Sequence, residues 1–148
     1  MGALLRLGWQ RVRGHLNEVI RAAGFTDLQD AHFAVFSWPP PDGVRLSQLA
    51  RQIGMSRQAT NYPVGQLVAL GYLERRAAAG SERRLIHLTR RGHEVVDTIF
   101  VSSRSLQRRR ADEVGPARFA AFMEVLRDIH AAKIDVPPDR GGPVRSRP

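Results

Sequence analysis

Apolar side chains recur every three or four positions over the first two dozen residues, with Arg, Gln, Asn and Glu between them. This spacing predicts a long amphipathic helix that ends at Gly24. The recurring positions are Leu5, Trp9, Val12, Leu16, Val19, Ile20 and Ala23. A second helix is expected within residues 27–37, with Phe33 and Phe36 facing inward. The run Pro39–Gly43 then forms a turn.

The middle of the chain has the pattern of two short helices joined by a tight turn. Ser47 is expected to be the N-cap of a helix that runs to Ile53. Gly54 supplies a turn residue that can adopt a positive φ, and Ser56 caps a second helix that continues to about Leu70. This order of elements is that of a helix-turn-helix.

Steps of 100° per residue divide the second of these helices into two faces. The row expected to pack inward consists of Thr60, Pro63, Val64 and Leu67. The opposite face carries Gln58, Asn61, Tyr62 and Gly65, with Arg57 at its N-terminal edge. Such a face offers hydrogen-bonding side chains to the edges of DNA bases.

Pro63 is an unusual residue for the interior of this helix. It has no N–H to donate to the Ala59 carbonyl, and it disfavours helical geometry at Tyr62. We therefore predict a bend near residues 59–63. Two interpretations stay open: the bend is merely tolerated, or it re-aims Asn61 and Tyr62 and so alters DNA recognition.

After Gly71 the period changes to that of strands. Residues 72–76 and 84–88 are expected to form two strands joined by a loop. Thr89 is expected to cap a further helix, and Pro116 suits the first turn of a last one. From residue 135 onward no periodic apolar residue is present, which indicates a flexible tail.

The first and last helices each carry a long apolar stripe, and a chain of 148 residues offers little core to cover both. This favours an interface with a second copy of the chain, most simply a two-fold dimer. The expected interface residues are Trp9, Val12, Leu16, Phe119, Phe122 and Leu126. The alternative is that the two stripes pack on each other within one chain.

Positive charge is concentrated in the centre of the chain. The formal net charge is +9, and residues 45–91 hold nine arginines against Glu74 and Glu82. A local basic field of this kind is typical of a surface that binds nucleic acid. Anionic lipid is a less suitable polyanion, because this stretch contains no basic amphipathic helix with a Trp/Phe face.

Other chemistries find little support in the sequence. The absence of cysteine excludes a disulfide scaffold and a thiolate zinc site, and no catalytic constellation can be assembled. His93 and Asp97 have a spacing that suits metal ligands, but no further ligand clusters near them. No apolar run approaches the roughly 18 residues of a membrane span. We expect a cytoplasmic protein with no enzymatic activity, cofactor or metal.

Three blocks of sequence carry a resemblance to a known family. They are Leu46–Ala50 (LSQLA), Leu67–Arg76 (LVALGYLERR) and Leu88–Gly92 (LTRRG). Together they resemble the winged helix-turn-helix of the MarR (multiple antibiotic resistance regulator) family of bacterial transcription factors. The resemblance is strong over about a third of the chain, and the flanking helices are similar only in pattern.

The resemblance implies a dimer with interlocked terminal helices and two winged domains placed for successive major grooves of a pseudo-palindromic operator. It also implies a small aromatic or phenolic effector. In the family's wing an Asp precedes arginines, one of which enters the minor groove. Here Gly80–Arg84 stands in that place, and either arginine takes the role. The DNA-binding residues expected are Ser47, Ser56, Arg57, Gln58, Asn61, Tyr62, Arg83 and Arg84.

The expected fold is mainly α with a small β-hairpin wing. Its parts are an N-terminal dimerisation helix (1–26), a winged helix-turn-helix DNA-binding domain (27–90), C-terminal dimerisation helices (91–134) and the tail (135–148). The expected function is that of a homodimeric, sequence-specific regulator, a repressor released by its effector, which binds double-stranded DNA. The alternative is a winged-helix dimerisation or interaction module that has lost specific DNA binding.

Overall fold

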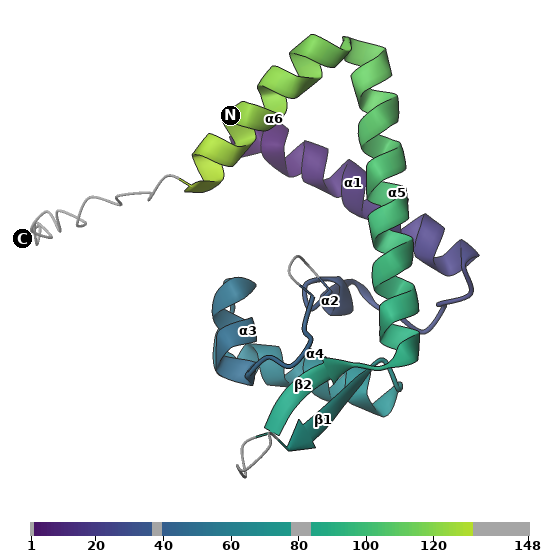
Figure 1. Ribbon diagram of the computed structural model, residues 1–148, viewed down its shortest axis with the longest axis vertical. Coiled ribbons are helices and arrows are strands. Elements are labelled where there is room, and N and C mark those ends of the chain that lie inside the picture. The colour runs from purple at the N-terminus through teal and green to yellow at the C-terminus, as the bar shows by residue number, and fades with distance from the viewer. Residues whose placement is uncertain (1, 37–39, 78–83, 132–148) are drawn as a thin grey trace, which may run out of the picture. The chain divides into compact units, whose positions relative to one another are not determined.

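The computed structural model describes residues 2–36, 40–77 and 84–131. The chain divides into two compact units, residues 1–106 and 107–148. Its elements are α1 (Gly2–Ala22), α2 (Asp30–Phe33), α3 (Leu46–Gln52), α4 (Arg57–Ala69), β1 (Leu73–Ala77), β2 (Arg84–Leu88), α5 (Arg90–Val114) and α6 (Pro116–Ala131). The mainly helical fold with one small hairpin is therefore confirmed (Figure 1).

The helix-turn-helix forms as the sequence predicts. Helices α3 and α4 pack against each other, and Gly54 between them has a φ of 68°. The Ser56 hydroxyl accepts a hydrogen bond from the Ala59 backbone N–H at 3.1 Å, which satisfies one of the unpaired donors at the start of α4. The inward row is confirmed, since the buried residues of α4 are Thr60, Pro63, Val64 and Leu67.

Two local predictions are wrong in detail. Ser47 is not the N-cap of α3 but its second residue, because Arg45 is the last extended residue and its carbonyl accepts from the Gln48 and Leu49 N–H groups. The helix starts earlier because Leu46 packs against the core. The second predicted helix is also shorter than residues 27–37, since α2 spans Asp30–Phe33; Phe36 is nevertheless buried.

Strands β1 and β2 form an antiparallel hairpin. Leu73 pairs with Leu88 and Arg75 with Ile86, while Glu74 pairs with His87. Because side chains alternate between the faces of a strand, Arg75 lies on the same side as the buried Leu73. On the other edge of β2, a single bridge joins Val44 to Ile86 and attaches the turn before α3 to the hairpin.

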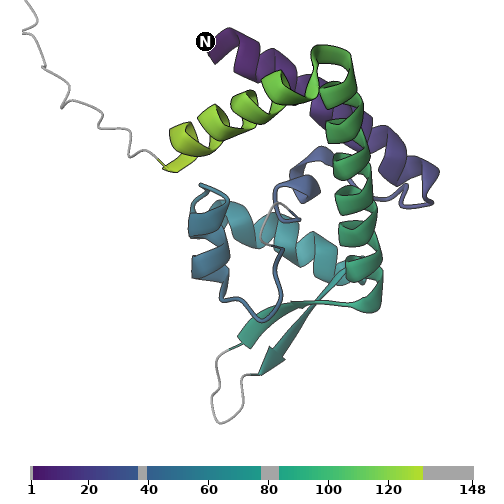
Figure 2. The same cartoon turned by 45° about the horizontal axis from the view of Figure 1, so that its top comes forward.

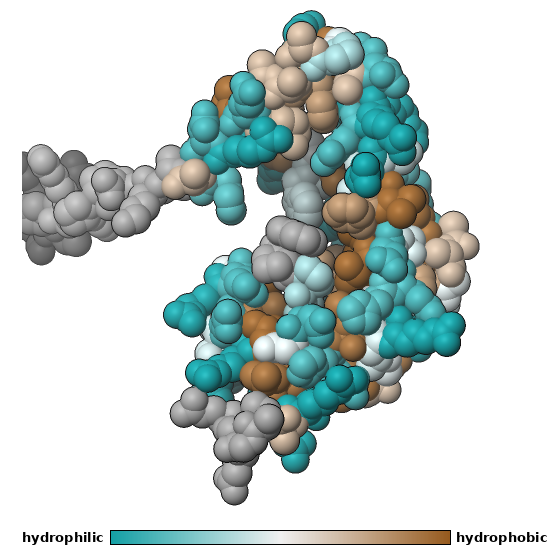
Figure 3. Space-filling view, viewed as in Figure 1, coloured by the Kyte–Doolittle hydropathy of each residue, from teal (hydrophilic) through white to brown (hydrophobic). Residues whose placement is uncertain are grey.

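One hydrophobic core joins these elements within residues 1–106. Its buried members are Ile20, Leu28, Val35, Phe36, Leu49, Val64, Leu67, Tyr72, Leu73, Ile86, Leu88 and Val95. They come from α1, α3, α4, both strands, the start of α5, the segments on either side of α2 and the residue before β1, so the core fixes α4 against the hairpin. The surface over α3 and the hairpin is mostly hydrophilic, with hydrophobic residues visible between them (Figure 3).

Asp27, in the segment between α1 and α2, is hydrogen-bonded to Tyr72, which precedes β1, and to Arg91 at the start of α5. The buried Tyr72 donates its hydroxyl proton to Asp27 at 2.5 Å, and Arg91 bonds the same carboxylate at 2.9 Å. The Tyr72 hydroxyl and then the Arg91 guanidinium hold the pKa of Asp27 below its ordinary value. Burial, followed by the bond to Asp27, raises the pKa of Tyr72. Helix α5 begins directly after β2, so Arg91 lies close to the hairpin (Figure 2).

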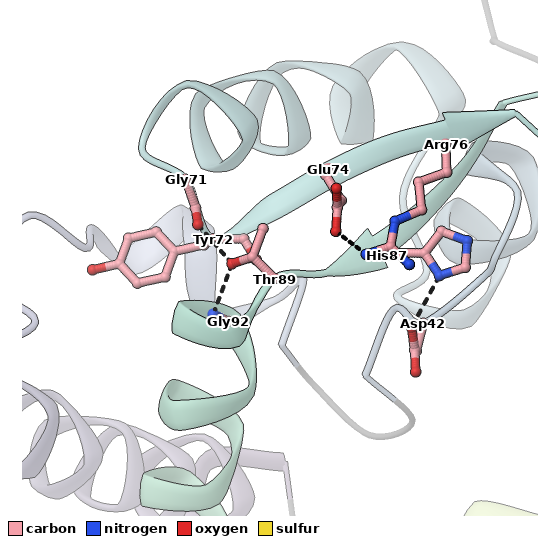
Figure 4. A network of polar contacts seen from close by, with 8 residues as sticks. All are labelled: Asp42, Gly71, Tyr72, Glu74, Arg76, His87, Thr89 and Gly92. Carbon is pink, nitrogen blue, oxygen red and sulfur yellow. Dashed lines mark hydrogen bonds and ion pairs between the residues drawn. The ribbon is translucent and has the colours of Figure 1, made fainter.

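Thr89 acts as the predicted cap of α5. Its hydroxyl bonds the Gly71 carbonyl at 2.6 Å and accepts from the Gly92 N–H at 3.2 Å (Figure 4). Helix α5 packs closely here, since a Cβ built on Gly92 would overlap the Tyr72 carbonyl oxygen and lie 2.9 Å from a Leu88 methyl carbon. The start of α5 and the start of β1 are thus in direct backbone contact.

Helices α1 and α6 differ from the central elements in burial. Ile20 is the single buried residue of α1, and α6 buries none of its side chains. At the C-terminal half of α1, His15 and Ser102 of α5 are hydrogen-bonded at 3.2 Å. No helix in the part of the chain described here is long and apolar enough to cross a membrane. The predicted tail, residues 135–148, lies outside the described residues.

Candidate nucleic-acid interface

The outward face of α4 is polar and open to solvent. Gln58, Asn61, Tyr62 and Gly65 are all exposed, as the 100° stepping predicts, and the Tyr62 residue is 69% exposed. Arg57 is exposed at the first position of the helix, directly after the cap Ser56. Hydrogen-bonding side chains therefore follow one face of a helix whose other face is fixed in the core.

Helix α4 continues through Pro63. The helix spans Arg57–Ala69 with Pro63 inside it, and the proline is buried. Because Pro63 has no N–H, the Ala59 carbonyl receives no hydrogen bond from it. The bend near residues 59–63 and its effect on recognition stay predictions.

A side chain of the hairpin bonds Asn61. The Arg75 guanidinium of β1 donates to Asn61 Oδ1 at 3.0 Å, across fourteen positions of sequence. Arg75 reaches α4 because it lies on the core-facing side of the hairpin, opposite Ile86. Sequence reasoning missed this contact, since nothing local in the sequence pairs the two residues.

Two successive hydrogen bonds connect Tyr62 to a buried histidine in the core. The Gln66 side-chain Nε2 donates to the Tyr62 hydroxyl oxygen at 3.2 Å. The side-chain Oε1 of the same Gln66 bonds His32 Nε2 at 3.0 Å. His32 Nδ1 accepts from the Gln29 backbone N–H, so Nε2 carries the imidazole proton and donates to Gln66. His32 is only 1% exposed, so this series of hydrogen bonds starts in the core.

The basic charge around α4 is only partly neutralised. Arg76 is paired with Glu74, Arg90 with Glu94 and Arg91 with Asp27. Within residues 45–91, five described arginines form no ion pair with another described residue: Arg45, Arg51, Arg57, Arg84 and Arg75, the last of which bonds Asn61 instead. These charges remain available to an anionic partner.

The wing contributes one of its two predicted arginines to the described structure. Arg84 is exposed at the start of β2, opposite Ala77, whereas Arg83 lies outside the described residues. At the base of the wing His87 bonds Asp42 at 3.1 Å (Figure 4). This contact ties the hairpin to the turn before α3.

The remaining candidate residues lie elsewhere. Ser47 is exposed on α3. His93 and Asp97 are on α5, and no cluster of three metal-ligating side chains occurs within residues 2–36, 40–77 and 84–131. Of the expected interface residues, Trp9 is 58% exposed and Phe122 51% exposed. The other four, Val12, Leu16, Phe119 and Leu126, are half-buried.

The sequence of the helix-turn-helix matches that of a known family. A model of the MarR family matches residues 39–84, which include α3, α4 and β1. Residues 39–84 are therefore similar to the MarR family. No curated protein matches the sequence.

Solved structures share this MarR-type fold over most of the chain. RV1404 from Mycobacterium tuberculosis is 22% identical with a TM-score of 0.68, over 90% of this chain and 92% of that one. The MarR family protein RV2887 of the same organism, in complex with salicylic acid, is 23% identical with a TM-score of 0.63, over 87% and 95%. CouR from Rhodococcus jostii RHA1, bound to p-coumaroyl-CoA, is 18% identical with a TM-score of 0.67, over 89% and 92%.

Proposed function

We propose that this chain is a homodimeric transcriptional regulator that binds double-stranded DNA in a sequence-specific manner. In this proposal α4 enters the major groove, and the wing arginines Arg83 and Arg84 contact the adjacent backbone or minor groove. Repression is the expected mode, in the cytoplasm, where a bacterial chromosome lies. Ser47, Ser56, Arg57 and Gln58 belong to the same proposed surface as Asn61 and Tyr62.

The exposed polar face of α4 is the observation that carries the proposal. The helix is anchored by a buried row, yet its outward face bears Gln58, Asn61 and Tyr62 and only one large apolar surface, the Tyr62 ring. Arg57 on α4 and Arg84 on the wing form no ion pair with any residue that the structure describes. Polar side chains read base edges and arginines neutralise phosphates, so this combination fits DNA better than a protein partner.

The proposed dimer rests on apolar side chains that the single chain leaves exposed. Trp9 and Leu5 on α1 are 58% and 43% exposed, and Phe122 and Val125 on α6 are 51% and 55% exposed. Obligate interfaces are large and apolar, and burial of these side chains against a second copy would supply one. Two copies would place two α4 helices on one DNA duplex.

A small aromatic or phenolic effector is part of the proposal. Salicylic acid is the ligand of RV2887 and p-coumaroyl-CoA that of CouR, both of which share the fold. In this chain, buried Asn17 Oδ1 accepts no hydrogen bond from any described residue, while its amide nitrogen donates to Asp30 at 2.8 Å. A ligand hydroxyl would satisfy this acceptor.

Salt dependence of DNA binding tests the proposed function. We expect log K to fall linearly with log salt concentration, by about 0.9 for each phosphate that the protein neutralises. Arg84→Ala is expected to weaken binding to every duplex and to reduce the slope by about 0.9 for the one phosphate that Arg84 neutralises. Fluorescence anisotropy of a labelled duplex between 50 and about 300 mM salt measures both quantities.

A charge-matched control accompanies this titration. Arg21→Ala removes the same charge from the exposed end of α1, outside α4 and the hairpin, and is expected to leave the slope unchanged. Binding that does not respond to salt, or no binding at low salt, contradicts the proposal and favours an interaction module without DNA affinity.

A further inference from the structure

We propose that Arg75 fixes the side-chain amide of Asn61 so that Asn61 meets DNA as a hydrogen-bond donor. The inference rests on the proposed function, which brings the outward face of α4 to the bases. It makes Arg75 a positioning residue for base selection rather than a phosphate contact. Its starting point is the 3.0 Å bond from the Arg75 guanidinium to Asn61 Oδ1.

The chemistry of arginine determines which end of the amide faces it. A guanidinium has five N–H donors and no acceptor, so only the carbonyl oxygen of an amide can bond it. Asn61 Oδ1 is therefore directed toward β1. The Nδ2 group, with two N–H donors on the other branch of the amide, is directed away from Arg75.

The Arg75 side chain is exposed, and its backbone is held in the hairpin. Arg75 lies on the core-facing side of the hairpin with the buried Leu73, and its partner across the strands, Ile86, is 2% exposed. Asn61 is on α4, one position after buried Thr60. The bond thus joins two rigid elements, and a rigid support is what precise reading of a base requires.

The neighbouring side chain, Tyr62, also presents a hydrogen-bond donor outward. The Tyr62 hydroxyl oxygen accepts a hydrogen bond from Gln66, which leaves the hydroxyl proton for an outside acceptor. Gln66 is itself fixed by His32, whose Nε2 donates to the Gln66 carbonyl oxygen. Asn61 and Tyr62 therefore both present hydrogen-bond donors outward. Arg75 orients Asn61, and Gln66 orients Tyr62.

A donor surface selects among base pairs. In the major groove guanine presents the two acceptors N7 and O6 and thymine presents O4, whereas adenine places the N6 donor beside its N7 acceptor and cytosine presents only the N4 donor. An asparagine that reads adenine bidentately needs its carbonyl oxygen for the N6 amino group, and here the bond from Arg75 uses one lone pair of that oxygen and turns it toward β1. We infer that Asn61 prefers guanine or thymine at the base it contacts.

The test compares base preference among variants at the sequence that the native protein selects from random duplexes. In Asn61→Asp a carboxylate oxygen replaces the N–H donors, while the acceptor for Arg75 is kept. Its preferred base is expected to change from guanine or thymine to cytosine or adenine. In Arg75→Ala the amide is free to rotate, and discrimination at that base pair is expected to fall from about tenfold or more to under about threefold.

Arg76→Ala is the matched control for Arg75→Ala. Arg76 is the next residue of β1, lies on the opposite side of the strand and is paired with Glu74. The substitution removes the same charge from the same strand, and it is expected to keep the native base preference. Thermal unfolding of both variants checks that the hairpin is intact.

Three outcomes overturn the inference in distinguishable ways. Retention of the native preference by both Asn61→Asp and Arg75→Ala contradicts the inference alone. A uniform loss of affinity in Arg75→Ala, with a salt slope smaller by about 0.9 and preference unchanged, shows that Arg75 is a phosphate contact. Failure of the native protein to select any sequence refutes the proposed function and the inference with it.

Discussion

Replacement of Gly92 by alanine is expected to lower the free energy of unfolding by about 3 kcal/mol or more. The added Cβ would overlap the Tyr72 carbonyl oxygen and lie 2.9 Å from Leu88 Cδ2. A backbone carbonyl cannot move aside as the end of a flexible side chain can, so α5 must shift. That shift breaks the bonds of Thr89 to Gly71 and Gly92. Chemical denaturation followed by circular dichroism measures the loss.

Gly65→Ala is the control for this prediction. Gly65 is exposed within α4, and a Cβ added there meets no atom within 4 Å. Alanine in an unobstructed helix interior stabilises a protein by about 0.5–1 kcal/mol relative to glycine, so this variant should unfold at a higher denaturant concentration. A Gly92→Ala protein as stable as the native one would contradict the close packing of α5 on β1.

Leu126→Asp is expected to abolish the dimer and to lower affinity for a two-half-site duplex by about 10²–10⁴-fold, because the two winged domains would no longer bind as one unit. A carboxylate in the apolar stripe of α6 would be buried without a partner in the proposed interface. Since α6 buries none of its side chains, the substitution leaves the core of the single chain intact. Analytical ultracentrifugation measures the change in mass.

Two further variants keep this prediction decisive. Phe122→Asp changes a residue that is already 51% exposed, so a folding defect is not expected and the loss of the dimer should be the same. Ala120→Asp adds the same charge to an exposed position of α6 that faces away from Phe122, Val125 and Leu126, and this variant should stay dimeric. A native protein that sediments as a monomer at micromolar concentration contradicts the proposed assembly.

The sequence was sufficient for the helix-turn-helix because its signals are local. Gly54 at φ 68° and the cap at Ser56 mark the turn, and the buried row of α4 follows from helical spacing alone. The cap of α3 was harder to place, because the serine at position 47 has the chemistry of a cap. Packing of Leu46 on the core moves the start of that helix to follow Arg45.

The supports of the candidate site could not be predicted, because each joins distant parts of the chain. Arg75 and Asn61 are fourteen residues apart, His32 and Gln66 thirty-four, and Tyr72 and Asp27 forty-five. No spacing or composition indicates such pairs. The sequence identified the exposed residues of α4, and the tertiary contacts determine which atoms of Asn61 and Tyr62 are presented outward.

Selection of bound sequences from a random pool of DNA duplexes tests the central claim most directly. Two α4 helices in one dimer are expected to enrich a site of two inverted half-sites, with centres about 10 base pairs apart or a multiple of that distance. Gln58→Ala in the same selection should enrich a more degenerate half-site. Enrichment of no sequence, or of a single half-site without two-fold symmetry, would contradict a dimer that reads DNA through α4.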